Sequence, residues 1–235
     1  MARQSRDSKK KPVRRSKQAK AKRKAAPPRK DDPTPAPRPR CPVVGVGASA
    51  GGLEAFPSGL PADTGIAFVL VQHLSPQHKS MIEELLRRHA KMPVTEAKQD
   101  TPIEPNRIYV IPPNATLTIE GANLHLVPAK ARDGRMPIDD FFSSLAETAG
   151  DRAACVILSG TGSDGTIGLR AIKEHGGLSL AQTEESAKYD GMLRSAVATG
   201  YVRPDLPATY RGRPILEKPF TGQDIEAVTW AMCGT

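Results

Sequence analysis

The chain has 235 residues, a formal net charge of +9 and 38% hydrophobic residues. This length allows one domain with a sizeable core and additional segments. No apolar stretch approaches the roughly 20 residues that a membrane-spanning helix needs, and the three cysteines are far apart in the sequence. Cys41, Cys155 and Cys233 fit neither a disulfide framework nor a metal-binding knuckle, so we expect a soluble cytoplasmic protein.

The positive charge is concentrated at the start of the chain. Residues 1–40 contain 16 of the 34 lysines and arginines and three acidic residues, whereas residues 41–235 carry a net charge of −4. The first 40 residues are too poor in apolar side chains to offset the entropy of ordering, so we expect a disordered tail. This tail either only solubilises the protein or contacts an acidic protein, an anionic membrane or nucleic acid.

The most informative segment is residues 43–52, an apolar run that ends in glycines with one serine among them. The run predicts a buried parallel strand that turns sharply into a helix, with Ser49 at the turn. The spacing Gly-x-Ser-x-Gly around Ser49 matches a nucleophile elbow, while Gly-x-Gly-x-x-Ala from Gly45 matches a dinucleotide-binding fingerprint. A third possibility is a glycine-rich turn that only lets a helix pack close to the strand.

The next predicted strand, at residues 65–73, helps to choose between the first two possibilities. A dinucleotide site needs an acidic residue at the end of this strand to bind the ribose. The strand ends instead in His73, and Asp63 lies before it, at the wrong end. This favours the nucleophile over the dinucleotide site.

Helical and strand patterns alternate along most of the remaining chain. The region between residues 94 and 128 differs: it holds three short strand patterns and indicates an inserted antiparallel ribbon. Residues 129–137 are expected to form a polar surface connection near the substrate, and residues 204–219 a proline-rich stretch of uncertain structure. The predicted helices are residues 53–60, 79–91, 138–149, 167–174, 192–198 and 224–232; the further strands are residues 153–158, 178–182 and 201–202, and the ribbon strands are residues 107–111, 116–120 and 124–127.

This alternation predicts an α/β fold: a doubly wound, mostly parallel sheet flanked by helices, with a small antiparallel hairpin insertion. In such sheets the functional site lies at the carboxyl ends of the strands. Ser49, His73 and Asp164 each follow a different apolar strand, so we expect them to meet at this edge. A serine nucleophile needs a base, and the base needs a group that orients it; these three residues supply those roles.

Each of these residues also has a simpler explanation. Taken singly, His73 is better explained as a strand-end residue and Asp164 as a turn former; together with Ser49 these explanations become less economical. The N–H donors for an oxyanion stay open between two sources. One is the backbone N–H of Ala50 at a helix start, and the other is the glycine-rich segment Thr161-Gly162.

Six segments between residues 42 and 203 carry a more specific signal: residues 46–52, Gln72-His73, residues 109–113, residues 156–165, Ala181-Gln182 and Gly191-Met192. In this order they resemble the catalytic domain of CheB, the chemotaxis protein-glutamate methylesterase. The resemblance implies that Ser49 is the nucleophile, His73 the base and Asp164 its orienting acid, with no metal or cofactor. It implies hydrolysis of γ-glutamyl methyl esters on chemoreceptor helices, with a related glutamine deamidation, and it adds Met192 to the candidate oxyanion or substrate-binding residues.

The chain differs from the usual family member in three places. A basic tail stands in the place of the amino-terminal receiver domain, Thr161 where methionine is frequent, and Leu193 where proline is common. We expect a tail at residues 1–40, a catalytic domain at 41–203 and a C-terminal extension at 204–235. The expected partner is an acidic helical segment of a methylated, chemoreceptor-like protein. The alternatives are a non-catalytic CheB-like module tethered to an acidic partner by its tail, and a nucleotide-binding domain.

Overall fold

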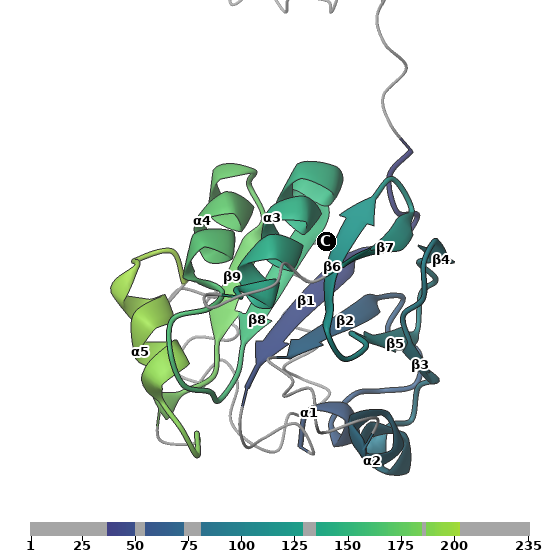
Figure 1. The fold of residues 1–235 in the computed structure, drawn as a ribbon, viewed down its shortest axis with the longest axis horizontal. Helices are drawn as coiled ribbons and strands as arrows, with labels where there is room; N and C mark the ends of the chain where they lie inside the picture. The colour runs from purple at the N-terminus through teal and green to yellow at the C-terminus, as the bar shows by residue number, and fades with distance from the viewer. Residues whose placement is uncertain (1–36, 50–54, 73–80, 129–134, 185–186, 203–235) are drawn as a thin grey trace, which may run out of the picture. The chain divides into compact units, whose positions relative to one another are not determined.

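A computed structural model of the chain describes residues 37–49, 55–72, 81–128, 135–184 and 187–202. Its centre is a six-stranded sheet in the order β3-β5-β2-β1-β8-β9, in which every neighbouring pair is parallel (Figure 1). The chain passes from β1 through β2 to one edge and later through β8 to the other, so the predicted doubly wound sheet is confirmed. Its strands are β1 (Val43–Ala48), β2 (Ala67–Gln72), β3 (Val94–Glu96), β5 (Arg107–Val110), β8 (Ala153–Ile157) and β9 (Leu178–Ala181).

The direction of winding changes between β1 and β8, which lie side by side. In open α/β sheets, ligands bind beside this point, in the crevice outside the carboxyl ends of the strands. Ser49 follows β1 directly, and Ser159 and Gly160 follow β8 after one further residue. The fold therefore brings these two chain segments to the position where a site is expected.

Both faces of the sheet are covered by helices, which explains the uninterrupted apolar runs of its strands. All six residues of β1 are buried. Val43 packs in one core cluster with side chains from α3 (Pro137–Ala149), α4 (Thr166–Glu174) and α5 (Gly191–Ala198). Val44 packs in the other with Phe56 of α1 (Ala55–Ser58) and Leu86 of α2 (Met81–His89).

Two glycines of β1 let α3 approach the sheet closely. A Cβ added to Gly45 would lie 2.7 Å from Phe142 Cε1, and one added to Gly47 would lie 2.6 Å from Ile138 Cγ2. Because cores are packed too densely to absorb such overlaps, a side chain at either position would push α3 away from the sheet. At these two positions the glycine-rich motif serves helix packing, and Ser49 lies beyond them.

The inserted region forms a small antiparallel sheet in the order β4-β7-β6. The predicted hairpin is present as β6 (Ala115–Glu120) and β7 (Asn123–Pro128), while β4 (Thr101–Pro102) adds a third strand that the sequence analysis misses. The assignment of residues 107–111 to this ribbon is wrong. They form β5, which pairs in parallel with β2 and β3 in the main sheet.

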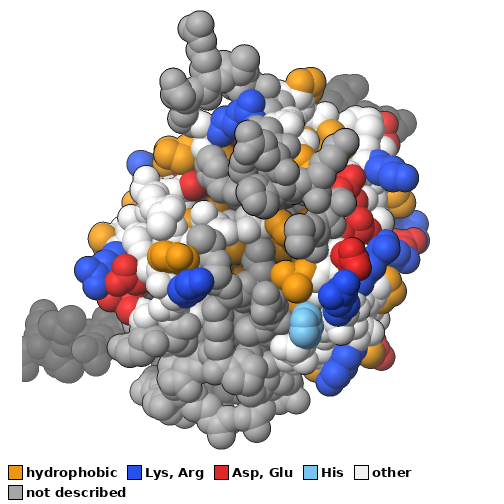
Figure 2. Space-filling model, turned by 60° about the horizontal axis from the view of Figure 1, so that its bottom comes forward, with side chains coloured by type: hydrophobic (Ala, Val, Ile, Leu, Met, Phe, Trp, Pro, Cys, Tyr) orange, Lys and Arg blue, Asp and Glu red, His pale blue; other side chains and the backbone are white. Residues whose placement is uncertain are grey.

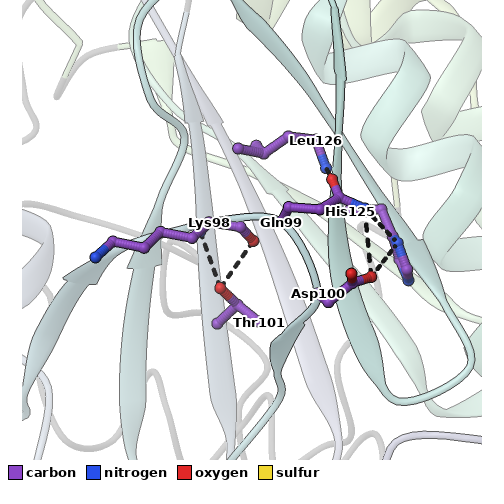
Figure 3. Close-up of polar contacts among 6 residues, drawn as sticks. All are labelled: Lys98, Gln99, Asp100, Thr101, His125 and Leu126. Atoms are coloured by element: carbon purple, nitrogen blue, oxygen red, sulfur yellow. Dashed lines mark hydrogen bonds and ion pairs between the residues drawn. The ribbon is translucent and has the colours of Figure 1, made fainter.

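Polar contacts around Gln99 fasten the segment before β4 to β7 (Figure 3). Gln99 Oε1 accepts a hydrogen bond from Leu126 N at 2.9 Å, and Gln99 Nε2 lies 3.1 Å from His125 Nδ1. The same ring nitrogen lies 3.0 Å from Asp100 Oδ1. His125 Nδ1 accepts from Gln99 only without a proton and donates to Asp100 only with one, so one of the two contacts is a hydrogen bond at a time.

The described helices agree with the predicted ones to within two residues at each end, and α3 is followed by the short 3₁₀ helix η1 (Gly150–Arg152). The strand predicted at residues 201–202 is wrong: these residues are irregular, and Tyr201 N donates to Thr199 Oγ1 at 3.1 Å. The segments predicted at residues 204–219 and 224–232 lie outside the described residues. Within the described part of the chain, no helix is both long and apolar enough to cross a membrane.

Candidate active site

Ser49 lies directly after β1 and is half-buried. Its backbone is held from both sides of the strand. Ser49 N donates to the Ser159 carbonyl at 3.2 Å, and Gln72 Nε2 donates to the Ser49 carbonyl at 2.5 Å. These bonds join the residue after β1 to the ends of β8 and β2, so the backbone of Ser49 is fixed relative to the sheet.

Gly160 leaves the space beside the Ser49 side chain. A Cβ added to Gly160 would lie 2.8 Å from Ser49 Cβ and would overlap Met192 Sδ. Met192 is buried at the start of α5, and its N–H donates to the Gly160 carbonyl at 3.0 Å. The structure therefore brings Met192, a predicted substrate-site residue, to the same glycine that Ser49 adjoins.

The segment Ser159-Gly160 is supported by two further parts of the chain. Ser159 N donates to Oε1 of Gln182, the residue after β9, at 2.9 Å. Gly160 N donates to the Tyr189 carbonyl at 3.0 Å, and Tyr189 N donates to Ser159 Oγ at 3.0 Å. The loops after β8 and β9 and the segment before α5 thus form one hydrogen-bonded wall beside Ser49.

Asp164 is buried in the loop between β8 and α4, and it caps the start of α3. Ile138 N donates to Asp164 Oδ2 at 3.1 Å, and Asp139 N donates to Oδ1 at 3.0 Å. A helix N-terminus is a favourable place for negative charge, because its N–H groups are free and its dipole is positive there. The carboxylate is thus held in one position by the backbone of α3.

Asp139 makes the reciprocal contact from α3 to α4. Its Oδ1 accepts a hydrogen bond from Gly168 N at 2.8 Å, while its Oδ2 is buried and has no partner among the described residues. Burial raises the pKa of Asp139 above its ordinary value, although backbone N–H groups of α4 oppose the shift. Asp164, which precedes α4, therefore caps α3, and Asp139 of α3 caps α4.

Two predicted oxyanion residues, Thr161 and Gly162, are exposed and lie against the start of α5. A Cβ added to Gly191 would lie 3.4 Å from Gly162 N and 3.5 Å from Thr161 Cα. Gly162 has a φ of 89°, in the left-handed region that favours glycine. The other two predicted residues, the base His73 and the oxyanion candidate Ala50, lie outside the described residues.

Gln72 is a site residue that the sequence analysis names only as the neighbour of His73. It bonds to the Ser49 carbonyl and also lines an open pocket, together with Asn114, Arg135 and Pro137. Arg135 and Pro137 belong to the connection that we expect near the substrate. The pairing of Ala48 with Gln72 in the β1–β2 ladder places this amide beside Ser49, and such a register is not visible in a sequence.

Metal-ligating side chains and cysteines are distributed as follows in the described part of the chain. They contain no group of three or more His, Cys, Asp or Glu side chains arranged to hold a metal ion. Cys155 is buried in β8, and burial raises the pKa of its thiol to about 12, so it is not a reactive thiolate at neutral pH. Cys155 thus lies within a strand, whereas the hydroxyl of Ser49 lies at the carboxyl end of the sheet.

The sequence matches the family model for CheB methylesterase over residues 44–210. A protein-glutamate methylesterase/protein-glutamine glutaminase of Anaeromyxobacter dehalogenans is 34% identical over 190 residues, which cover 79% of this chain and 56% of that protein. A putative protein of the same name from Leptospira interrogans is 34% identical over 160 residues, covering 66% of this chain and 83% of that protein.

The fold is also similar to a solved structure. The crystal structure of the CheB methylesterase catalytic domain of Thermotoga maritima has a TM-score of 0.63 and 26% sequence identity, and the match covers 69% of this chain and 90% of that one. The chain spans about half the length of several curated relatives that it matches, including those from Anaeromyxobacter and Caulobacter. By sequence and by fold, this chain belongs to the CheB methylesterase family.

Proposed function

We propose that this chain is a serine hydrolase that removes the methyl group from glutamate γ-methyl esters of a chemoreceptor-like protein. The main supporting observation is the position of Ser49 beside the point where the winding of the sheet changes direction, with its backbone bonded to Ser159 after β8 and to Gln72 at the end of β2. Family membership supports the reaction, since curated relatives are named protein-glutamate methylesterase/protein-glutamine glutaminase. The same site would accept a glutamine amide in place of the ester.

In the proposed mechanism Ser49 Oγ attacks the ester carbonyl carbon while His73 accepts the hydroxyl proton. The tetrahedral intermediate carries a negative charge on the former carbonyl oxygen, and backbone N–H groups of Ala50 or of Thr161 and Gly162 stabilise it. Methanol leaves with the proton from His73, and water then hydrolyses the acyl-enzyme in the reverse sequence of proton transfers. Asp164 orients the imidazole of His73.

The partly buried setting of Ser49 supports such chemistry. Its neighbours Gly160 and Met192 leave no room for another side chain on that side of the serine. The carboxylate of Asp164 is held by two backbone N–H groups and needs no reorganisation when a positive imidazolium forms. A fixed acid and a fixed serine backbone are the preorganised parts that a triad requires.

The decisive test is methanol release from a methylated receptor fragment. We expect Ser49→Ala and His73→Ala each to lower turnover by a factor on the order of 10⁶, and the double variant to lose little more, because triad residues act as one unit. Additive losses would contradict the triad. A fluorophosphonate probe should label Ser49 alone, and peptide mapping would detect labelling elsewhere.

The alternative is a non-catalytic module of the same family that only binds an acidic partner. It predicts binding of the methylated fragment with no methanol release by the full-length chain. Removal of the basic tail tests both the catalytic and the binding-only hypothesis. Removal of the tail should preserve turnover of a small methyl ester but weaken capture of an acidic partner, and this difference should disappear at high salt.

A further inference from the structure

Tyr189 is the residue outside the predicted site that is tied most closely to its wall. Its N–H donates to Ser159 Oγ at 3.0 Å, while its carbonyl accepts from Gly160 N at 3.0 Å and from Ser159 Oγ at 3.2 Å. Gly160 in turn adjoins the side chain of Ser49. These hydrogen bonds fix the backbone of Tyr189. It contacts Gly160, which in turn adjoins the nucleophile candidate Ser49.

The side chain of Tyr189 is exposed although its backbone is fixed. It is 41% exposed, and it is one of the few large apolar side chains in the described ranges with that much exposure. A single exposed aromatic residue is ordinary on a protein surface. An exposed tyrosine whose backbone is fixed beside a candidate site is better suited to binding, because Tyr offers a large contact area with only two side-chain torsions to order.

Lys188 adds a positive charge to this ring. Its Nζ lies 5.5 Å from the centroid of the Tyr189 ring, within the range of a cation–π contact. The other cation nearby, Arg194, is already paired with Glu184 at 3.3 Å and Asp190 at 2.7 Å. Lys188 is exposed, and its charge lies over the outer face of this ring. Figure 2, which views the lower side of Figure 1, shows lysine and arginine side chains among acidic and hydrophobic ones on the described part of that face.

We propose that Tyr189 and Lys188 form a docking platform for the acidic segment that carries the ester. The apolar ring fits the apolar face of an amphipathic helix, and the ammonium group fits carboxylates on its polar face. This inference rests on the proposed function and deepens it. Each turnover converts a neutral ester into a carboxylate, so a segment with several esters becomes more acidic and is held more tightly by Lys188 as it is processed.

The test uses two amphipathic peptides, each with one glutamyl γ-methyl ester. One has glutamates flanking the ester and the other has glutamines in their place. Binding is measured by fluorescence anisotropy in the Ser49→Ala background, so that no turnover is needed. We expect Tyr189→Ala to weaken binding of the glutamate peptide on the order of tenfold, and Tyr189→Phe, which keeps the ring, to bind like the parent.

At low salt, Lys188→Gln should weaken binding of the glutamate peptide about threefold and leave binding of the glutamine peptide unchanged. At high salt it should affect neither peptide. Val127→Ala is the matched control, since Val127 is also 41% exposed but lies on β7 of the small sheet. Parent-like binding by Tyr189→Ala, or an equal effect of Lys188→Gln on both peptides, would overturn the platform.

The enzyme form gives a second readout that separates this proposal from the proposed function. With Ser49 intact, the loss in kcat/KM caused by Tyr189→Ala should be about tenfold larger for the glutamate peptide than for a small methyl ester. If the unaltered chain released methanol from none of the esters, the proposed function would be wrong. The anisotropy measurements would still test the docking platform, because they need no turnover.

Discussion

Gly160 and Gly162 lie two residues apart, yet the structure assigns them different roles. A Cβ at Gly160 would press on Ser49 and Met192, whereas a Cβ at Gly162 would meet nothing within 4 Å. Gly162 instead requires glycine for its φ of 89°. One glycine provides space beside the nucleophile candidate, and the other provides a backbone conformation.

We therefore expect Gly160→Ala to lower kcat about a hundredfold, because displacement of a reacting group by about 1 Å has that effect. Gly162→Ala should mainly cost stability, about 1 kcal/mol from backbone strain. Methanol release and urea denaturation of both variants check this. A Gly160→Ala enzyme with full turnover would show that the Ser49 side chain does not depend on this space.

Asp139 makes stability depend on pH in a direction unusual for a carboxyl group. Burial raises its pKa in the folded state above the ordinary value of 3.8, so between the two values the folded protein binds more protons than the unfolded one. The free energy of unfolding that Asp139 contributes therefore falls as pH rises through this window. Asn at this position keeps an acceptor for Gly168 N and carries no charge.

Accordingly, the Asp139→Asn variant should become more stable relative to the unaltered protein as pH increases above about 4. Below about pH 4 the stabilities of the two proteins should depend on pH in nearly the same way. Urea denaturation across this pH range measures the difference between the two proteins. A difference that stays constant with pH would show that the pKa of Asp139 is the same in the folded and unfolded states.

At the scale of elements, α3 begins without a cap from its own sequence. Met136 precedes its first residue and makes no side-chain cap hydrogen bond, and Asp164 supplies the cap instead. Asp164→Asn loses one acceptor oxygen and places an amide donor against a backbone N–H. We expect a loss of about 1–2 kcal/mol of stability, measured by thermal denaturation, in addition to any loss of turnover.

The control for this prediction is Ser49→Ala, which should lose turnover without a comparable loss of stability because Ser49 is held through its backbone. If Asp164→Asn melts at the same temperature as the unaltered protein, the cap contributes nothing measurable. If it melts lower, turnover of the variant has to be compared well below its melting temperature.

Gln99 has a similar role in the small sheet, where its Oε1 accepts from Leu126 N. We expect Gln99→Ala to speed hydrogen exchange of the Leu126 amide about fivefold, since a single hydrogen bond contributes about 1 kcal/mol. Gln99→Glu keeps the acceptor oxygen and should retain most of the protection. Equal exchange in all three proteins would show that the Gln99 contact does not limit local opening.

The long periodic elements could be predicted from sequence, and the short ones could not. The buried strands and amphipathic helices have patterns strong enough to fix their type, so the predicted helices agree with the described ones to within two residues. β3 has three residues and β4 has two, too few to show a period. The error at residues 107–111 has another cause: strand alternation does not reveal which sheet a strand joins.

At the scale of the whole molecule, the folded body begins before the end of the predicted tail. Pro39 is buried, and its carbonyl accepts a hydrogen bond from Arg152 Nη2 at 2.9 Å; Ala67 N donates to the Pro42 carbonyl at 3.0 Å. Pro37 lies against the hairpin turn, 3.2 Å from where a Cβ of Gly121 would be. The basic composition continues through Arg38 and Arg40, so composition alone does not mark where packing starts.

We therefore expect a chain lacking residues 1–36 to melt like the full chain, and one lacking residues 1–40 to lose about 1–2 kcal/mol, a few degrees in melting temperature. Arg152→Ala in the longer form provides the control, since it removes the same hydrogen bond without shortening the chain. Identical melting of the two truncations would show that residues 37–40 add no stability.

The candidate site was predictable in part for the same reason as the fold. Strand ends identify which residues reach one edge of a parallel sheet, and this reasoning selects Ser49, His73 and Asp164. The roles of Gln72, Asp139 and Tyr189 come from contacts between segments distant in sequence, such as Gly168 N with Asp139 Oδ1. No local pattern encodes such contacts. The catalytic roles of Ser49, His73 and Asp164 stay predictions.

The exchange of caps between α3 and α4 also bears on how inactive relatives would be recognised. If Ser49 is the nucleophile as proposed, a relative without hydrolase activity could replace the serine and still benefit from an aspartate at the place of Asp164, because that carboxylate caps α3. On the proposed function, retention of that acid in a genome sequence is therefore weaker evidence for a working enzyme than retention of the serine.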